Sequence, residues 1–159
     1  MPSITPDDLA RAMRAGELWL AYQPKIALDN DWLVGVEALA RWNHPTLGAI
    51  PPGEFIPVAE QANLITPLTE WALAAAASDW SMWRTQGLDA NIAVNVSALS
   101  LDQPEWPDFW SARCQKGGMP LDALTIELTE SATSSVVEVL DELTRFRIMG
   151  AGISLDDFG

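Results

Sequence analysis

The sequence has little of several residue types, and each scarcity excludes a class of protein. A single cysteine, Cys114, rules out an internal disulfide framework and is typical of a reducing cytoplasm. We interpret Cys114 as a packing residue rather than a nucleophile, because the one histidine, His44, lies in an apparent loop. No apolar run reaches the length of about 18 residues that a membrane span requires, and residues 1–6 lack the pattern of a secretory signal. We therefore expect a cytoplasmic location and no membrane segment in this chain.

Positive charge is scarce as well. Nine lysines and arginines stand against 22 aspartates and glutamates, which gives a formal net charge of −13. This balance argues against binding a DNA or RNA polymer through its phosphates. The surplus acid either forms a solvated surface or includes metal ligands, because bound divalent cations invert the local field. With 159 residues, 48% of them apolar, the chain is long enough for one domain with a real core.

Strand and helix patterns alternate along the chain, which indicates an α/β fold with a largely parallel sheet. The patterns predict five strands, at residues 18–23, 32–37, 91–95, 124–128 and 152–156. The first two are predicted to form an antiparallel hairpin around Asp29-Asn30-Asp31, and prolines and glycines predict a long loop over residues 45–53. Helices are predicted over residues 5–16, 55–60 and 66–87, before Gly117-Gly118, and after a capping box formed by Ser135 and Glu138.

Four short apolar runs within the predicted strands each end in a side chain whose oxygen can bind a metal. These side chains are Glu37, Asn95, Glu127 and Asp156, and the last is followed at once by Asp157. The carboxyl ends of barrel strands meet at one face, so we expect these groups to converge. A set of oxygen donors favours Mg²⁺, Mn²⁺ or Ca²⁺ over zinc, and adjacent aspartates suit a two-metal phosphoryl displacement. For any single residue, an ordinary strand-end acid that begins a turn is the alternative.

Six motifs, in this order, resemble the EAL domain family of bacterial cyclic di-GMP phosphodiesterases. They are Tyr22-Gln23-Pro24, Glu37-Ala38-Leu39-Ala40-Arg41-Trp42, Phe55-Ile56-Pro57 with Ala59-Glu60, Asn95-Val96-Ser97, Glu127-Leu128-Thr129-Glu130 and Asp156-Asp157-Phe158-Gly159. The resemblance implies an incomplete TIM-like (β/α) barrel, with about five of eight strands and an antiparallel first strand. It also implies one domain over residues 1–159, with an N-terminal helix at 1–16 and a partial barrel at 17–159.

The resemblance further implies roles for single residues. Glu37, Asn95, Glu127 and Asp156 look like ligands of a first Mg²⁺ or Mn²⁺ ion, and Asp156 with Asp157 would contribute to a second. Glu37, Asp156 and Asp157 would thus be catalytic. Gln23, Leu39 and Arg41 resemble positions that contact the dinucleotide, with Arg41 as a phosphate clamp; an ion pair of Arg41 with Glu60 is the alternative. Glu130 resembles a position that supports the loop after the next strand; an ordinary loop carboxylate is the alternative.

In the family, activated water attacks one phosphodiester bond of cyclic di-GMP, the 3′ oxygen leaves, and linear pGpG results. The family pattern continues past Asp-Asp-Phe-Gly with a lysine, a glutamate and a glutamine that this sequence lacks, so we expect impaired hydrolysis by the truncated chain. An open sheet edge at Asp156 predicts a homo-oligomer. A non-catalytic cyclic di-GMP-binding module and a dimerisation module remain alternatives.

Overall fold

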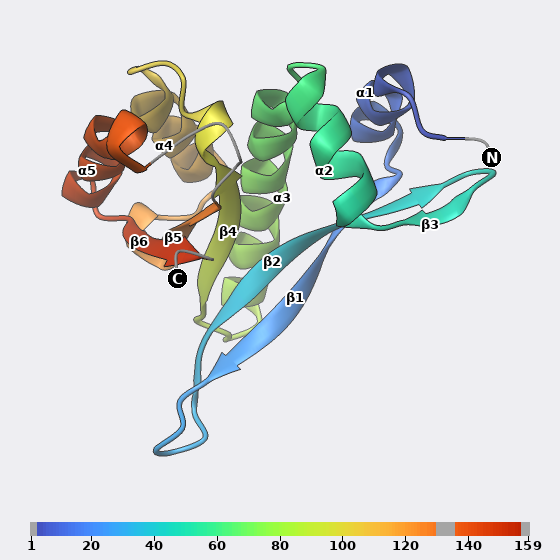
Figure 1. Ribbon diagram of the computed structural model, residues 1–159. Coiled ribbons are helices and arrows are strands. Elements are labelled where there is room, and N and C mark those ends of the chain that lie inside the picture. The colour runs from blue at the N-terminus through green and yellow to red at the C-terminus, as the bar shows by residue number, and fades with distance from the viewer. Residues whose placement is uncertain (1–2, 130–135, 157–159) are drawn as a thin grey trace.

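The structure, a computed structural model, describes residues 3–129 and 136–156 (Figure 1). The helices are α1 (Pro6–Ala15), α2 (Pro52–Gln61), α3 (Ile65–Thr85), α4 (Trp106–Lys116) and α5 (Leu140–Ile148). The strands are β1 (Leu18–Ile26), β2 (Leu33–His44), β3 (Gly48–Ile50), β4 (Asn91–Ser97), β5 (Leu124–Thr129) and β6 (Gly152–Asp156). Short 3₁₀ turns lie at Ala98–Ser100, Leu121–Ala123 and Val136–Val139. In the described ranges, no helix is both long and apolar enough to cross a membrane.

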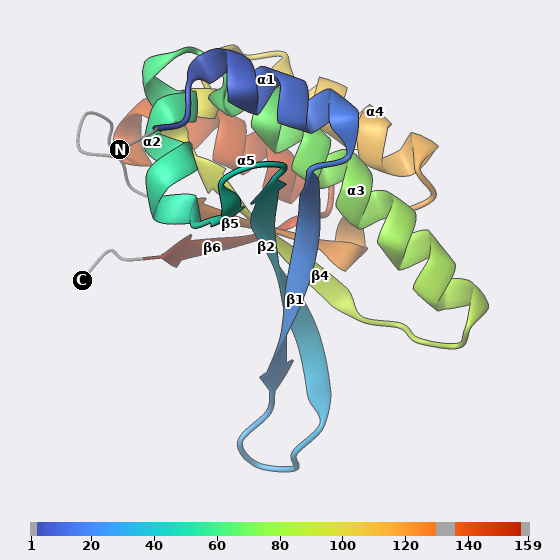
Figure 2. The same ribbon diagram turned by 90° about the vertical axis from the view of Figure 1, so that its right-hand side faces the viewer.

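One mixed sheet positions the predicted site residues that the structure describes. Its strands follow the order β1-β2-β4-β5-β6, and β3 pairs with β2 off this path. β1 and β2 are antiparallel, whereas β2, β4, β5 and β6 are parallel neighbours. Helices α3, α4 and α5 lie along one side of the sheet (Figures 1 and 2). The five-strand path and its antiparallel first strand confirm the predicted open portion of a (β/α) barrel; within the described residues, the sheet does not close.

Local signals account for the first helix. The hydroxyl of Thr5 accepts a hydrogen bond from the Asp8 backbone N–H at 3.1 Å, and the Asp8 carboxylate accepts one from the Thr5 N–H at 2.9 Å. Such a reciprocal capping box satisfies two backbone donors that a helix start leaves without partners. Gly16 ends the helix with φ of 74°, a conformation that glycine adopts without strain. The predicted N-terminal helix is therefore confirmed.

The region predicted as a long loop is partly a second hairpin. β2 does not end at Glu37 but continues to His44, and β3 returns along it with Trp42 opposite Ile50. The physical reason is the turn: Gly48 has φ of 76°, which lets the chain reverse tightly after Pro45 instead of running on as a loop. The prediction of five strands was wrong by this one short strand. The capping box predicted at Ser135 lies outside the described residues.

The core divides into two clusters. The larger lies between the helix-covered face of the sheet and α3, α4 and α5, where alternate residues of the central strands point outward: Ile92, Val94, Val96, Leu124, Ile126 and Leu128. The smaller cluster joins α1 and α2 to the far end of β2 through Leu9, Trp42 and Phe55. Because successive strand residues face opposite sides, burying these apolar residues outward fixes the intervening residues on the other face of the sheet.

Candidate functional site

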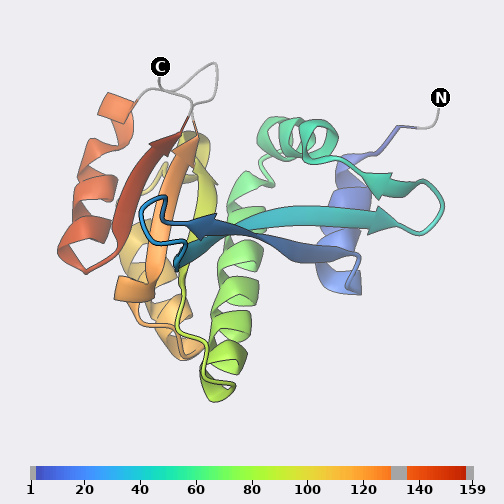
Figure 3. The same cartoon turned by 90° about the horizontal axis from the view of Figure 1, so that it is seen from below.

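The face of the sheet that the helices leave uncovered carries the predicted site residues whose side chains the structure describes, and we call it the inner face. Gln23 pairs with Glu37 across β1 and β2, and Asn95 pairs with Glu127 across β4 and β5. Directly paired residues lie on the same side of a sheet. Because Glu37 pairs with Ala93, and Asn95 follows two residues later, all four side chains share the inner face. Figure 3 shows the end of the β1–β2 ribbon passing in front of the other strands.

Glu37 and Asn95 are in direct contact. The Asn95 side-chain amide donates a hydrogen bond from Nδ2 to Glu37 Oε1 over 3.0 Å. This bond fixes the orientation of the amide and leaves its carbonyl oxygen available as an acceptor or ligand. Glu37 lies in the interior of β2, one residue before the end of the parallel pairing with β4 at Ala38. The predicted convergence of these two strand positions is therefore present, although the strand itself runs on past Glu37.

Glu127 is buried and paired with a cation. Its side chain is only 7% exposed, and its Oε1 accepts a hydrogen bond from the ammonium group of Lys25 on β1. A buried carboxylate without a compensating charge carries a desolvation cost of several kcal/mol. Lys25 was not among the predicted site residues. The available signal was period-two alternation, because Lys25 follows Gln23 by two residues and so faces the same side of β1.

A cavity of about 300 Å³ lies beside Glu37 and Asn95. Its wall includes Glu37 and Asn95 together with Leu39 and Arg41, which were predicted to contact a substrate. Gln23 is exposed and lies outside this wall. The rest of the lining is mostly apolar and comes from α2, α3 and the adjoining strands, including Ile56, Leu68 and Ala72. The structure thus brings an acid, an amide and a guanidinium to one partly apolar hollow.

The ion pair considered as an alternative for Arg41 does not form among the described residues. Arg41 Nη1 instead donates to the Ala40 carbonyl at 3.1 Å. Glu60 accepts a hydrogen bond from the Ser97 hydroxyl at 3.0 Å, which ties α2 to the end of β4 beside Asn95. Ser97 belongs to the motif Asn95-Val96-Ser97, and the sequence predicted no role for it. Its contact with Glu60 braces the strand end that carries Asn95 and leaves the guanidinium of Arg41 without an acidic partner in the described part of the chain.

Three predicted residues cannot be placed as side chains. Asp156 ends β6, and its backbone pairs with Thr129, two positions beyond Glu127 on β5. The side chain of Asp156 lies outside what the structure describes, as do Asp157 and Glu130 entirely. The register therefore places the Asp156 backbone next to the candidate site, and the predictions for these three side chains remain predictions.

The described donors suit a hard divalent cation. Glu37, Asn95 and Glu127 offer only oxygen ligands from three neighbouring strands, and such ligands fit Mg²⁺, Mn²⁺ or Ca²⁺. The ammonium of Lys25 already contacts Glu127, so this position holds positive charge. Within residues 3–129 and 136–155, no group of three or more His, Cys, Asp or Glu side chains is placed to hold a metal. The described set is thus two carboxylates and one amide.

Comparisons with known proteins agree with this geometry. The chain is 40% identical over 158 residues to the bifunctional diguanylate cyclase/cyclic di-GMP phosphodiesterase MucR of Pseudomonas aeruginosa, covering 96% of this chain and 22% of MucR. It is 36% identical to the cyclic di-GMP phosphodiesterase RocR of the same organism, covering 100% of this chain and 40% of RocR.

The solved structure "PaMucR Phosphodiesterase, c-di-GMP complex" matches with a TM-score of 0.87 and 40% identity, covering 96% of this chain and 63% of that one. The chain spans less than half of the length of MucR and of RocR. The family model of the EAL domain matches residues 7–159, nearly the whole length of the sequence. On this evidence, the chain belongs to the EAL domain family.

Proposed function

We propose that this domain hydrolyses cyclic di-GMP to linear pGpG in a metal-dependent reaction. The observation that carries the proposal is the arrangement on the inner face, where Asn95 is hydrogen-bonded to Glu37 and paired in register with the buried Glu127. The named activities of MucR and RocR support cyclic di-GMP as the substrate, and the solved MucR complex supports it as the ligand.

The metal would be held by the oxygen donors of the inner face. We infer that Glu37, Asn95 and Glu127 bind one Mg²⁺ or Mn²⁺ ion together with Asp156, and that Asp156 and Asp157 serve a second. When bound, such ions acidify a water molecule and neutralise charge on the phosphodiester. The bond from Asn95 to Glu37 orients both ligands before any ion arrives, and Glu130 would support the neighbouring loop.

The substrate would lie along the same face. Arg41 has a planar guanidinium that matches two phosphate oxygens, and in the described residues no carboxylate competes for it. The cavity volume of about 300 Å³ is at the lower end of small-molecule sites, so we infer that it receives part of the dinucleotide. Leu39 would contact that part from the wall, and the exposed Gln23 would contact the remainder.

The first experiment is hydrolysis by the purified protein. The protein is incubated with cyclic di-GMP and Mn²⁺, products are resolved by chromatography, and Glu37→Ala is compared with Glu54→Ala. Glu54 is an exposed acid in the first turn of α2, so its replacement removes the same charge away from the site. We expect pGpG from the unmodified protein and from Glu54→Ala, and none from Glu37→Ala. Equal turnover by both variants would contradict the role of Glu37.

Absence of pGpG from the unmodified protein would contradict hydrolysis by this chain and direct attention to binding. Cyclic di-GMP binding without turnover, abolished by Arg41→Ala, would identify a non-catalytic binding module. Neither binding nor turnover would leave the dimerisation module as the surviving alternative.

We also infer that the isolated 159-residue chain self-associates. Among the described residues β6 pairs only with β5, and Leu155 on β6 is 49% exposed. An edge strand with unpaired backbone groups is a template for pairing with another chain. Light scattering at rising protein concentration should show an increasing mass, and a constant monomer mass at high concentration would contradict the inference.

A further inference from the structure

We propose that Lys25 is the resident counter-cation of the candidate site, which a divalent metal must displace from Glu127, so that Lys25 sets the affinity of the site for metal. The inference rests on the proposed function in one respect, because it takes Glu127 as a metal ligand. It adds a residue and a property that the motifs did not indicate.

Lys25 reaches Glu127 across two intervening strands. Lys25 lies on β1 and Glu127 on β5, with β2 and β4 between them. In a flat sheet three strand spacings would separate these backbones by about 14 Å, so the contact requires a sheet that curls over its inner face. Gly35 is directly opposite Lys25 on β2 and adds no side chain to that face. No side chain of the directly paired residue on β2 therefore blocks the Lys25 side chain as it extends toward the central strands.

The two partners of this ion pair differ in their exposure. The Glu127 side chain is 7% exposed, whereas that of Lys25 is 41% exposed. The buried carboxylate is shielded from water, so its negative charge is costly unless a cation lies beside it. The lysine ammonium is strongly hydrated on a flexible stem and can return to water at low cost. The pair is therefore built to exchange its cation while Glu127 stays in place.

Displacement is favoured by the surroundings of Glu127. Asn95 is its direct neighbour in the β4–β5 register and is itself bonded to Glu37, so a second acid lies close to the first. A divalent ion can interact with both carboxylates and with the amide oxygen, whereas the ammonium contacts only Glu127 among the described acids. A fixed structural salt bridge is the competing explanation for Lys25. The two explanations can be told apart by measurement, because a fixed salt bridge would not compete with metal for Glu127.

The test is the affinity for Mn²⁺ without substrate, measured by calorimetry for Lys25→Met and for a matched control, Lys116→Met. Lys116 is the only other lysine and is an exposed residue at the end of α4, so the control makes the same change in net charge. We expect Lys25→Met to bind Mn²⁺ roughly three- to tenfold more tightly than the control. In EDTA, Lys25→Met should unfold at a temperature about 3–8 °C lower than the control, because Glu127 loses its cation. Saturating Mn²⁺ should remove this difference.

Each outcome decides the proposal. Equal Mn²⁺ affinity in the two variants, or a stability loss in Lys25→Met that persists in saturating Mn²⁺, identifies a fixed bridge and overturns the exchange. Lys25→Arg keeps the charge and should keep the weaker affinity of the unmodified protein; tight binding by this variant would also count against the proposal. If the unmodified protein binds no Mn²⁺, binding by Lys25→Met supports the exchange and its absence overturns it. Hydrolysis is not measured in this test. If the Mn²⁺ affinity does not depend on Lys25 but the protein still forms pGpG, the exchange is overturned and the proposed function stands.

Discussion

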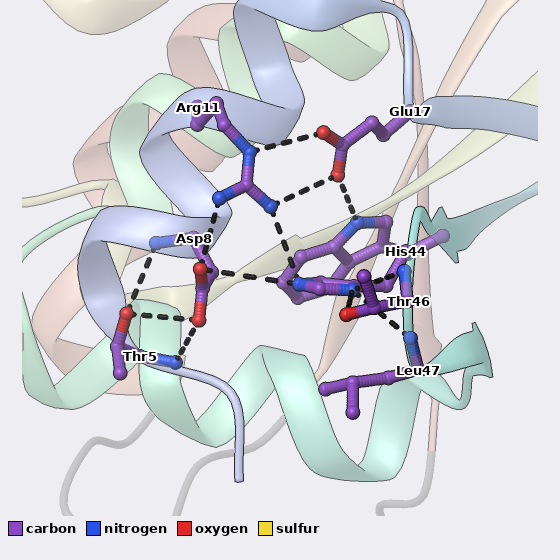
Figure 4. A network of polar contacts seen from close by, with 8 residues as sticks. Thr5, Asp8, Arg11, Glu17, His44, Thr46 and Leu47 are labelled. Carbon is purple, nitrogen blue, oxygen red and sulfur yellow. Dashed lines mark hydrogen bonds and ion pairs between the residues drawn. The ribbon is translucent and has the colours of Figure 1, made fainter. Parts of the chain in front are cut away.

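Two groups of polar side chains, one at the far end of β2 and one on the inner face, differ in how many partners their acids have. At the far end of β2, side chains of α1 and its neighbours form a closed cluster (Figure 4). Arg11 donates from Nε to Glu17 Oε1 at 3.1 Å and from Nη1 to Asp8 Oδ1 at 3.0 Å. Glu17 also accepts from the Trp42 indole N–H at 2.9 Å. The ring Nδ1 of His44 accepts from two backbone N–H groups at 3.2 Å each.

On the inner face, the acids have fewer partners. Glu37 receives one amide hydrogen bond and Glu127 receives one ammonium among the described residues. A carboxylate can accept about four hydrogen bonds, so both Glu37 and Glu127 have acceptor positions that no described residue fills. Polar groups that saturate one another hold an element in place, as the first network holds α1. Acids such as the buried Glu127 and the partly buried Glu37, which have few hydrogen-bond partners, are positioned to bind a ligand that brings its own positive charge.

The largest expected effect is a difference in the rate of hydrolysis between a variant of the inner face and a variant of the α1 network. Glu127→Gln keeps the shape of the side chain but removes the charge that would bind metal, so hydrolysis of cyclic di-GMP should fall at least about 100-fold. Glu17→Gln makes the same chemical change in the α1 network and should leave the turnover rate unchanged. Both rates are measured by chromatography of pGpG at saturating Mn²⁺. A similar loss of activity in both variants would remove the functional distinction between the networks.

The next effect tests the backbone beneath the site. A Cβ added at Gly35 would lie 2.9 Å from the Asn91 carbonyl oxygen on β4, a distance that forces the two strands apart. Gly35→Ala should therefore lower the free energy of unfolding by about 1–3 kcal/mol. Gly53 in α2 has nothing within 4 Å of the same added atom, so Gly53→Ala should be neutral or slightly stabilising. Urea unfolding compares the two variants, and equal stability would mean that β2 and β4 tolerate the separation.

Local patterns predicted most of the fold. The capping residue Thr5, the turn before β2 and the glycines after α4 are signals contained within a few residues, and the elements they predict are present. The pairing of β3 with β2 was missed because Gly48 and the prolines around it are compatible with either a loop or a tight reversal. The pairing of β3 with β2 distinguishes a hairpin from a loop, and this pairing cannot be predicted from a local sequence pattern.

The site was predictable where alternation along a strand sufficed. Glu37, Asn95 and Glu127 could be placed on one face because each stands in a strand with apolar residues on either side. The contact between Lys25 and Glu127 could not be predicted, because it joins residues 102 positions apart and depends on the curl of the whole sheet. The link between Ser97 and Glu60 likewise depends on how α2 packs against β4.

A smaller effect compares the two faces of β1 at adjacent residues. Tyr22 faces α3, where its hydroxyl donates to Asp79 Oδ2 at 2.5 Å, while Gln23 faces the inner side with Glu37. Burial first, and the bond to Asp79 second, raise the pKa of Tyr22, so the phenol keeps its proton and remains a donor. Tyr22→Phe should lower the free energy of unfolding by about 1 kcal/mol and leave hydrolysis unchanged. Gln23→Ala should leave the free energy of unfolding unchanged and should raise the KM for cyclic di-GMP.

The smallest effect is the response of the α1 network to acid. The hydrogen bond from Arg11, followed by that from Trp42, lowers the pKa of Glu17 below its ordinary value of 4.5. A carboxyl whose pKa is lower in the folded state stabilises the fold fully above the ordinary value, and this contribution disappears as pH falls through the lowered folded-state value. The unfolding temperature should therefore drop as the pH falls from about 5 to 3, and Arg11→Met should reduce that drop because Glu17 loses its main partner.

Arg14 provides the control for this response, because it is an exposed arginine on the same helix with no ion pair in the described residues. Arg14→Met removes the same charge and should keep the full acid sensitivity of the unmodified protein. The two variants should therefore differ most in unfolding temperature near pH 7 and converge near pH 3. Parallel curves would show that Arg11 acts only through net charge. The hydrogen bonds of the α1 network would then add nothing to the stability of α1 beyond the effect of surface charge. The contrast with the inner face would rest on the behaviour of Glu127 and Lys25 alone.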